Sequence, residues 1–234
     1  MKTLGLLGGM TYHATLAYYA EINGHVQKQL GGVHAAKLLL HSFNYHDVIT
    51  PWKAGDMPAV SRMLCDAARN LQSIGADAIV LCVNTNHLFA EDIERATPGI
   101  PLLHIIDFTA EAILRAGLKK IALLGTTMSM GKDFLKGRLK DKYGLEVLLP
   151  SQDNGVWEKM DEAIFGDLPK KIITPETKKL YLDAVEDLVS RGAQGIILGC
   201  TELAFVLEPK DVSVPLFDTV ELHARGVAQW AVDN

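Results

Sequence analysis

The sequence AARNLQSIGADAIVL at residues 67–81 is the most informative part of the chain, because it recurs as AVEDLVSRGAQGIIL at residues 184–198. The two stretches lie 117 residues apart, which is half of the 234-residue chain, and they share seven identical positions. Each has the pattern of an amphipathic helix that ends before a glycine, Gly75 or Gly192, and is followed by a short apolar run. A helix, a glycine and a buried run in this order are typical of an α/β unit with a parallel strand.

A second block of sequence repeats at the same offset. Residues 6–8 (LLG) fall on residues 123–125, which are also LLG. The alternative explanation for these matches is that all α/β units have similar sequences. Two separate matching blocks at one offset favour an internal duplication instead. The duplication predicts two similar lobes that are related by a pseudo-two-fold axis.

Eight short apolar runs are expected to be buried parallel strands, with helix-length amphipathic segments between them. The expected strands are residues 4–8, 37–41, 78–82, 101–104, 121–125, 146–149, 195–199 and 214–217. The clearest helices are residues 58–74 and 175–191, each with a proline near its first turn. This alternation predicts an α/β fold of two Rossmann-like lobes with parallel sheets. We expect lobe one to comprise residues 1–104 plus 214–234 and lobe two residues 105–213.

Composition limits the classes of function. Apolar residues make up 48% of the chain and charged residues 22%, the balance of an ordinary globular protein. The formal charge of −5, without a basic run, argues against a nucleic-acid partner. No apolar run approaches the roughly 18–20 residues of a membrane span, and the N-terminal run is too short for a signal peptide. Three widely spaced cysteines predict free thiols and a cytoplasmic protein, and the histidines show no zinc-binding spacing.

The loops that follow the strands are the expected site, because open α/β sheets bind ligands beyond the carboxyl ends of their strands. Gly-Gly-Met-Thr at residues 8–11 follows the first strand, and Gly-Thr-Thr at residues 125–127 follows its repeat partner. Free backbone N–H groups at such helix starts suit a carboxylate or a phosphate. Neither loop has the P-loop lysine, and the first lacks the full dinucleotide fingerprint, which disfavours nucleotide binding.

A cysteine lies near the same place in each half of the chain. Cys82 ends one expected strand shortly before Asn84, and Cys200 ends the partner strand just before Thr201. A helix N-terminus can lower the pKa of a thiol, and two thiols across a cleft could remove a proton from carbon and return it. Such a transfer inverts a stereocentre without a metal or a cofactor. The alternative is a buried apolar cysteine, which weighs equally for Cys82 and less for Cys200.

The chain resembles the aspartate/glutamate racemase family over essentially its whole length. The motifs that carry the resemblance are KTLGLLGGM at residues 2–10, NTNH at residues 84–87 and GCTE at residues 199–202. The resemblance implies an active site in the cleft between the two lobes, and a homodimer. It implies racemisation of aspartate or glutamate by two thiols, Cys82 and Cys200, without pyridoxal phosphate, another cofactor or a metal. The substrate-binding residues that it implies are Met10, Lys53, Asn84, Thr85, Thr126, Thr201 and Glu202.

These residues have structural alternatives. Asparagine and threonine are preferred helix N-caps, and a cap at a cleft can still bind a substrate. Glu202 could receive the substrate ammonium, orient the thiol or only complement a helix dipole. Lys53 is the candidate for the distal carboxylate of the substrate, but it could equally be a solvated loop lysine.

One position departs from the family pattern, which has cysteine directly before Asn84, where this chain has Val83. At the 117-residue offset Val83 falls on Cys200, and Cys82 falls on Gly199. A one-residue slip along a strand reverses the side-chain direction and would turn Cys82 away from the cleft. Three outcomes stay open. A local bulge brings Cys82 into the site, His87 or a bound water serves the second face of the substrate, or Cys200 is the only base.

The single-base outcome leaves two other functions open. One is a decarboxylase or lyase that acts on a related carboxylic acid with Cys200 alone. The other is a non-catalytic protein that binds an amino acid in a retained cleft. Racemisation of an acidic amino acid is the function that the motifs favour.

Overall fold

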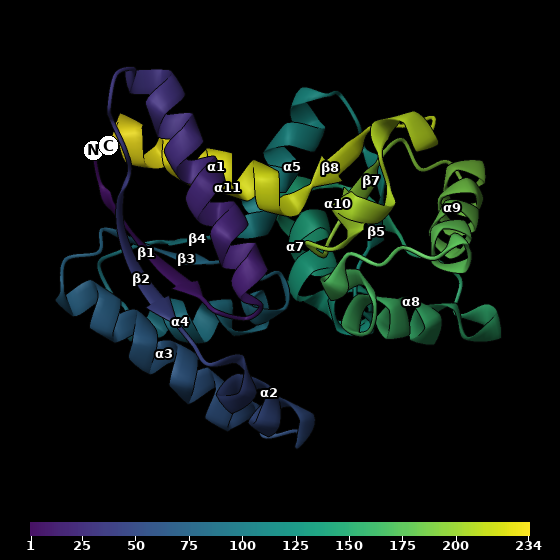
Figure 1. Ribbon diagram of the computed structural model, residues 1–234. Coiled ribbons are helices and arrows are strands. Elements are labelled where there is room, and N and C mark those ends of the chain that lie inside the picture. Colours follow the sequence, from purple (N-terminus) through teal and green to yellow (C-terminus); the bar gives the residue numbers. More distant parts are fainter. The chain divides into compact units, whose positions relative to one another are not determined.

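A computed structural model describes all residues from Met1 to Asn234. The chain divides into two compact units (Figure 1). Unit 1 comprises Met1–Ile105 and His223–Asn234, and unit 2 comprises Ile106–Leu222. The strand pattern of the sequence predicts that the chain returns to lobe one at residue 214. Residues 214–222 belong instead to unit 2, because the strand β8 (Leu216–Asp218) pairs with a strand of that unit.

Unit 1 is built on a parallel sheet with the strand order β2-β1-β3-β4. Its strands are β1 (Thr3–Gly8), β2 (Lys37–Ser42), β3 (Ala78–Leu81) and β4 (Leu102–Leu103). Figure 1 shows α1 (Tyr12–Leu30) and the end of α11 (Thr219–Asp233) on one face of this sheet. The helices α3 (Met57–Ser73) and α4 (Ala90–Ala96) lie on the other face. Covering on both faces explains why the central strands are continuous apolar runs rather than alternating ones.

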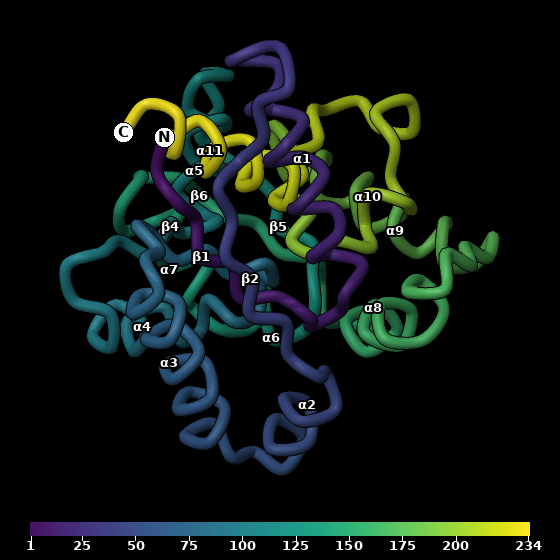
Figure 2. The backbone as a smooth tube through the Cα atoms, turned by 60° about the vertical axis from the view of Figure 1, so that its left-hand side comes forward, coloured from purple at the N-terminus to yellow at the C-terminus, as the bar shows by residue number.

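The two ends of the chain meet in unit 1. The backbone N–H of Lys2 donates a hydrogen bond to the carbonyl oxygen of Ala231 at 2.8 Å. Figure 2 shows the N- and C-termini side by side beyond the first strand. A backbone hydrogen bond therefore links the last helix to the residue that directly precedes the first strand.

Unit 2 repeats this topology, with the strand order β6-β5-β7-β8 in a second parallel sheet. Its strands are β5 (Lys120–Leu124), β6 (Glu146–Leu148), β7 (Ile196–Leu198) and β8. Its helices are α5 (Ile105–Arg115, whose first residue lies in unit 1), α6 (Thr127–Gly131), α7 (Asp133–Tyr143), α8 (Val156–Phe165), α9 (Pro175–Ser190) and α10 (Leu203–Val206). All the expected strands are confirmed, and the shared strand order confirms two similar α/β lobes.

The pairing register of the two sheets is the same at the 117-residue offset. Leu7 pairs with Leu81 in unit 1, and Leu124 pairs with Leu198 in unit 2. The backbone hydrogen bonds beyond the strands also correspond. The N–H of Cys82 donates to the carbonyl of Leu7 at 3.0 Å, and the N–H of Gly199 donates to that of Leu124 at 2.7 Å. Cys82 is thus the structural equivalent of Gly199, and no bulge shifts it by one residue.

The two repeated helices, α3 and α9, end as their sequences predict. Gly75 has a φ of +100° and Gly192 a φ of +93°, a backbone conformation in which other residues are strained. At the other end, Asp56 caps α3 by accepting from Ala59 N–H, and Thr174 caps α9 by accepting from Thr177 N–H. In each unit, the glycine at the end of the helix therefore directs the backbone into the following strand.

None of the helices has the length and apolar character that crossing a membrane requires. The three cysteines, Cys65, Cys82 and Cys200, are unpaired thiols, as their spacing predicts. A cytoplasmic location remains a prediction.

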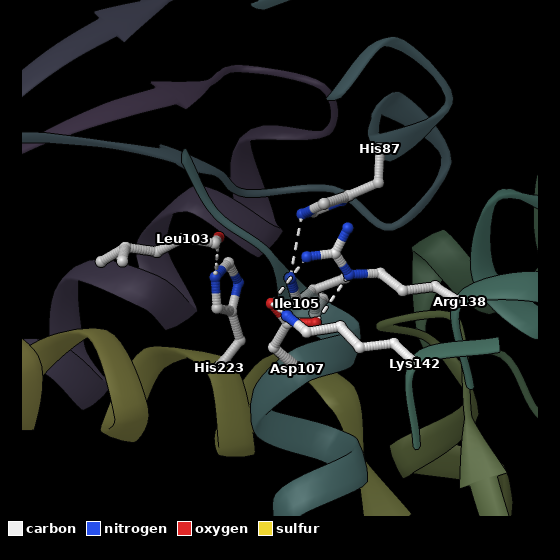
Figure 3. A network of polar contacts seen from close by, with 7 residues as sticks. All are labelled: His87, Leu103, Ile105, Asp107, Arg138, Lys142 and His223. Carbon is white, nitrogen blue, oxygen red and sulfur yellow. Dashed lines mark hydrogen bonds and ion pairs between the residues drawn. The ribbon is translucent and has the colours of Figure 1, made fainter. Parts of the chain in front are cut away.

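An ion-pair cluster joins α5 to α7 within unit 2 (Figure 3). Asp107 accepts from Arg138 Nε at 2.6 Å and Nη2 at 2.7 Å, and from Lys142 Nζ at 2.9 Å. Burial alone would raise the pKa of Asp107, but these hydrogen bonds outweigh it and hold the pKa below its usual value. The carboxylate is therefore charged, and it stabilises the packing of the two helices.

Replacing Asp107 with asparagine is expected to lower the free energy of unfolding by about 1–2 kcal/mol at neutral pH. The native pKa lies below the unfolded value of about 3.9, so the contribution is present above about pH 4. It is lost as the pH falls through the native pKa. Urea denaturation of wild type and Asp107→Asn, at neutral pH and below about pH 4, checks this. Equal urea midpoints of the two proteins at neutral pH would contradict it.

Candidate active site

Cys200 lies at the carboxyl end of the sheet in unit 2, directly after β7 and Gly199. A Cβ atom on Gly199 would lie 2.7 Å from the carbonyl oxygen of Leu124, so only glycine fits there. This close approach sets the β7 loop against the neighbouring loop that follows β5 at Gly125. Cys200 is a partly exposed residue, whereas Cys65 and Cys82 are buried. Among the three cysteines, Cys200 is therefore the one closest to solvent.

The Cys200 thiol donates a hydrogen bond to the Glu202 carboxylate, with Sγ 2.9 Å from Oε2. Desolvation is the largest effect on this thiol and raises its pKa, and the Glu202 charge and hydrogen bond raise it further. A helix N-terminus is expected to lower the pKa of a thiol. The structure corrects this expectation, because the carboxylate and burial outweigh the backbone amides. Cys200 is therefore a protonated thiol in its resting state.

Two further side chains on the helices of unit 2, Asp161 and Tyr181, were not predicted from the sequence as part of this region. Asp161 of α8 accepts from the N–H of Thr127 at 2.8 Å. Tyr181 of α9 is buried, and burial raises the pKa of its hydroxyl, with smaller contributions from Asp161 and Glu202. Neither residue is in a recognisable motif, because each lies mid-helix and reaches the strand ends only when α8 and α9 fold over the sheet. Glu202 is thus the carboxylate in contact with the Cys200 thiol, while Asp161 holds the loop after β5.

Thr126 caps α6 from the loop after β5. Its hydroxyl accepts from Ser129 N–H at 3.1 Å and donates to Ser129 Oγ at 3.0 Å. The prediction of an N-cap at Thr126 is confirmed, while its substrate-binding role stays a prediction. Thr201 and Glu202 are partly exposed beside Cys200. Unit 2 thus gathers Thr126, Cys200, Thr201 and Glu202 at the carboxyl ends of β5 and β7.

Unit 1 gathers Met10, Asn84 and Thr85 at the carboxyl ends of β1 and β3. The Asn86 side-chain amide donates to Met10 Sδ at 3.1 Å, which joins the loop after β1 to the 3₁₀-helix η1 (Thr85–Phe89). Asn84 precedes η1 but does not cap it through its side chain. These residues form the unit 1 counterpart of the loops around Cys200.

Lys53 lies apart from these residues, exposed at the end of α2 (Tyr45–Lys53). Its neighbour Trp52 packs edge-on against Phe89 of η1, with ring centroids 5.8 Å apart. The end of α2 is therefore attached to η1, and the Lys53 side chain extends into solvent. Its role in binding a distal carboxylate stays a prediction.

Cys82 is fully buried in unit 1, and burial raises the pKa of its thiol. Val83, the equivalent of Cys200, packs partly buried against the core of unit 1. At the position where unit 2 presents a thiol, unit 1 therefore presents a hydrocarbon side chain. Within the chain, no group of three or more His, Cys, Asp or Glu residues is arranged to hold a metal ion.

Replacing Glu202 with glutamine is expected to lower the pKa of Cys200, because the neutral amide no longer disfavours the thiolate. The rate of alkylation by iodoacetamide, followed against pH, reports this pKa. Glu202→Gln should reach half of its maximal alkylation rate at lower pH than wild type. Superimposable profiles would show that Glu202 does not act on the thiol, and a Glu208→Gln variant serves as an exposed-carboxylate control.

Comparisons with known proteins agree in fold and in family. The family model of the Asp/Glu/Hydantoin racemases matches residues 7–227. The broad specificity amino-acid racemase RacX of Bacillus subtilis is 26% identical over 222 residues, covering 92% of both chains. A Yersinia pestis crystal structure, provisionally described as an Asp/Glu racemase, is 43% identical with a TM-score of 0.93, covering 99% of this chain and 100% of that one. An aspartate racemase homologue from Pyrococcus horikoshii is 32% identical with a TM-score of 0.84, at the same coverage.

Proposed function

Because the chain belongs to the Asp/Glu/hydantoin racemase family, whose named members are isomerases, we propose that it racemises an acidic amino acid, aspartate or glutamate. The observation that carries the proposal is the Cys200–Glu202 pair at the end of β7. A partly exposed thiol that already holds its proton can donate that proton to carbon. It does so at the edge of the sheet where α/β proteins bind their ligands.

The proposed reaction begins when a base removes the proton from Cα of the substrate. The electron pair of the Cα–H bond is delocalised into the α-carboxylate, and the Cys200 S–H then gives its proton to Cα from its own face. The thiolate that remains is short-lived beside Glu202, because the neighbouring carboxylate favours the protonated form. In the reverse direction this thiolate is the base that removes the Cα proton.

The substrate-binding roles are proposals of the same kind. Asn84 and Thr85 in unit 1 and Thr126 and Thr201 in unit 2 offer amide, hydroxyl and backbone N–H groups to the α-carboxylate and the ammonium. Met10 would contact the carbon chain, and Lys53 is the cation proposed for the distal carboxylate. The positions of the residues other than Lys53 at strand ends support these roles, whereas Lys53 lies at the end of α2.

A single-thiol decarboxylase or lyase is the second candidate, and Val83 is the observation that favours it. Val83 stands where the equivalent residue of unit 2 is the thiol Cys200. A hydrocarbon side chain cannot carry a proton, so positions 83 and 200 cannot form a pair of thiols. If the protein is a racemase, its second proton carrier is a group other than the side chain at position 83.

Proton NMR of L- and D-aspartate and L- and D-glutamate in D₂O tests the proposal, with chirality measured on the same samples. We expect the Cα–H signal of one acid to disappear together with inversion. Exchange without inversion, or release of carbon dioxide, would favour the single-thiol candidate. If none of the four exchanges, the acidic substrate is wrong.

We also propose that the protein is a homodimer, with α1 as its interface. Tyr12, Leu16 and Tyr19 are 60%, 59% and 57% exposed, and their spacing places them along one side of the helix. A contiguous exposed apolar stripe on a monomer marks an interaction surface. Light scattering should give about twice the chain mass of 25.6 kDa, and a monomeric mass would refute the dimer.

A further inference from the structure

His87 lies in η1, immediately after the candidate substrate-binding residues Asn84 and Thr85, and it is buried. Its Nδ1 is 3.0 Å from the carbonyl oxygen of Val83 and 3.2 Å from that of Asn84. On the other side of the ring, the backbone N–H of Ile105 donates to Nε2 at 3.2 Å (Figure 3). The imidazole therefore bridges the turn after β3 and the first residue of α5.

The partners of His87 determine which ring nitrogen carries the proton. A backbone N–H can only donate, so Nε2 must be unprotonated to accept from Ile105. A carbonyl can only accept, so Nδ1 carries the proton and donates to Val83 and Asn84. Both ring nitrogens are thus hydrogen-bonded to backbone groups, and neither is placed to exchange a proton with a substrate. The expectation that His87 serves the second face of the substrate therefore lacks support in this geometry.

A second buried histidine is fixed in the same way beside it. His223 Nε2 donates to the carbonyl of Leu103 at 2.8 Å, and its Nδ1 accepts from the Tyr18 hydroxyl at 2.6 Å. The rings of His87 and His223 meet edge to face with centroids 5.9 Å apart, and the His104 ring lies 4.5 Å from His87.

These residues coincide with the boundaries of the two units. Ile105 is the last residue of unit 1 before the chain enters unit 2, and His223 is the first residue after it returns. The histidines thus join the turn at residues 83–84 to both places where the chain passes between the units.

We propose that His87 is a positioning residue of the candidate site, which fixes the turn that carries Asn84 and Thr85. The effect on catalysis rests on the proposed function, because it requires these two residues to bind the substrate. The effect on the turn does not, since it follows from the hydrogen bonds alone. Loss of the Nδ1–H donor leaves two buried carbonyls without this partner, so the turn should open more often.

Two substitutions separate the two sides of the ring. His87→Asn retains an N–H donor near the place of Nδ1 and loses the acceptor for Ile105. His87→Gln places its amide oxygen near Nε2, where it can accept from Ile105, and loses the donor to the turn. Each variant leaves buried polar groups unpaired, so both are expected to lower the Tm. Tyr18→Phe, which removes a hydroxyl at His223, is a further control that leaves the turn intact.

The first measurement is steady-state racemisation by the folded variants, with Tm measured in parallel. We expect His87→Gln to lower kcat/KM by about 10- to 100-fold, mainly through KM, because the binding residues are displaced. His87→Asn and Tyr18→Phe should stay within about threefold of wild type. Equal losses in the Asn and Gln variants, in proportion to their Tm, would overturn the positioning role.

The second measurement is hydrogen exchange, read by mass spectrometry on the peptide that spans residues 82–89. This segment should exchange faster in His87→Gln than in His87→Asn, and Tyr18→Phe should match wild type. Equal exchange in the two His87 variants would refute the inference even if the enzyme is a racemase. If wild type racemises neither acid, the proposed function fails, and the exchange result still decides whether His87 holds the turn.

Discussion

Replacing Val83 with cysteine is expected to raise the rate of racemisation by about 100-fold, the lower end of the range that a positioned acid–base group supplies. Val83 is the structural equivalent of Cys200, since both follow strands of the same pairing register. A cysteine there adds a second thiol without moving the backbone. Chiral chromatography of the aspartate or glutamate product measures the gain.

Val83→Ala is the matched control for this substitution. It removes the same two methyl groups from the core of unit 1 but adds no proton carrier. Its rate should not exceed that of wild type. A gain in both variants would show that space, rather than a thiol, limits the reaction, and no gain in Val83→Cys would contradict the equivalence of the two positions in catalysis.

Replacing Cys200 with serine is expected to lower the rate by about 100- to 10,000-fold, because a hydroxyl is a much weaker acid than a thiol. Serine keeps a similar size and can still donate a hydrogen bond to Glu202. The change therefore tests the proton carrier and not the shape of the loop. Exchange of the Cα proton in D₂O should fall in parallel with inversion.

Cys82→Ala is the cysteine control in unit 1. Because Cys82 is fully buried and equivalent to Gly199, we expect little change in rate and a loss of about 1 kcal/mol in the free energy of unfolding. A loss of activity as large as that of Cys200→Ser would instead place Cys82 in the reaction, as the family resemblance implies.

The strand pattern and the internal repeat could be predicted from the sequence because both depend on local apolar runs. The 117-residue offset already aligned Cys82 with Gly199, and the register of β1 with β3 and β5 with β7 agrees with it. The residue at which unit 2 ends could not be predicted from local apolar runs. Whether residues 214–222 join one sheet or the other depends on the pairing of β8 with β7, which is a contact distant in the sequence.

The chemistry of the candidate site was only partly predictable. The GCTE motif identified Cys200 and Glu202, but not that the carboxylate would accept the thiol proton at 2.9 Å. Asp161 and Tyr181 could not be predicted, because the contact of Asp161 with Thr127 and the burial of Tyr181 depend on how α8 and α9 pack. His87 was noticed for its loop, whereas its role depends on bonds to residues as distant as Ile105.

The meeting of the two chain ends in unit 1 has a consequence for how the chain can be reconnected. Unit 1 is made of two separate segments, and Lys2 and Ala231 are already joined by a backbone hydrogen bond. A circular permutant that starts at residue 223 and runs through a short linker into residue 1 would hold all of unit 1 in one stretch. Unit 2 would then follow as a second stretch, and each half of the duplication could be expressed as an unbroken polypeptide.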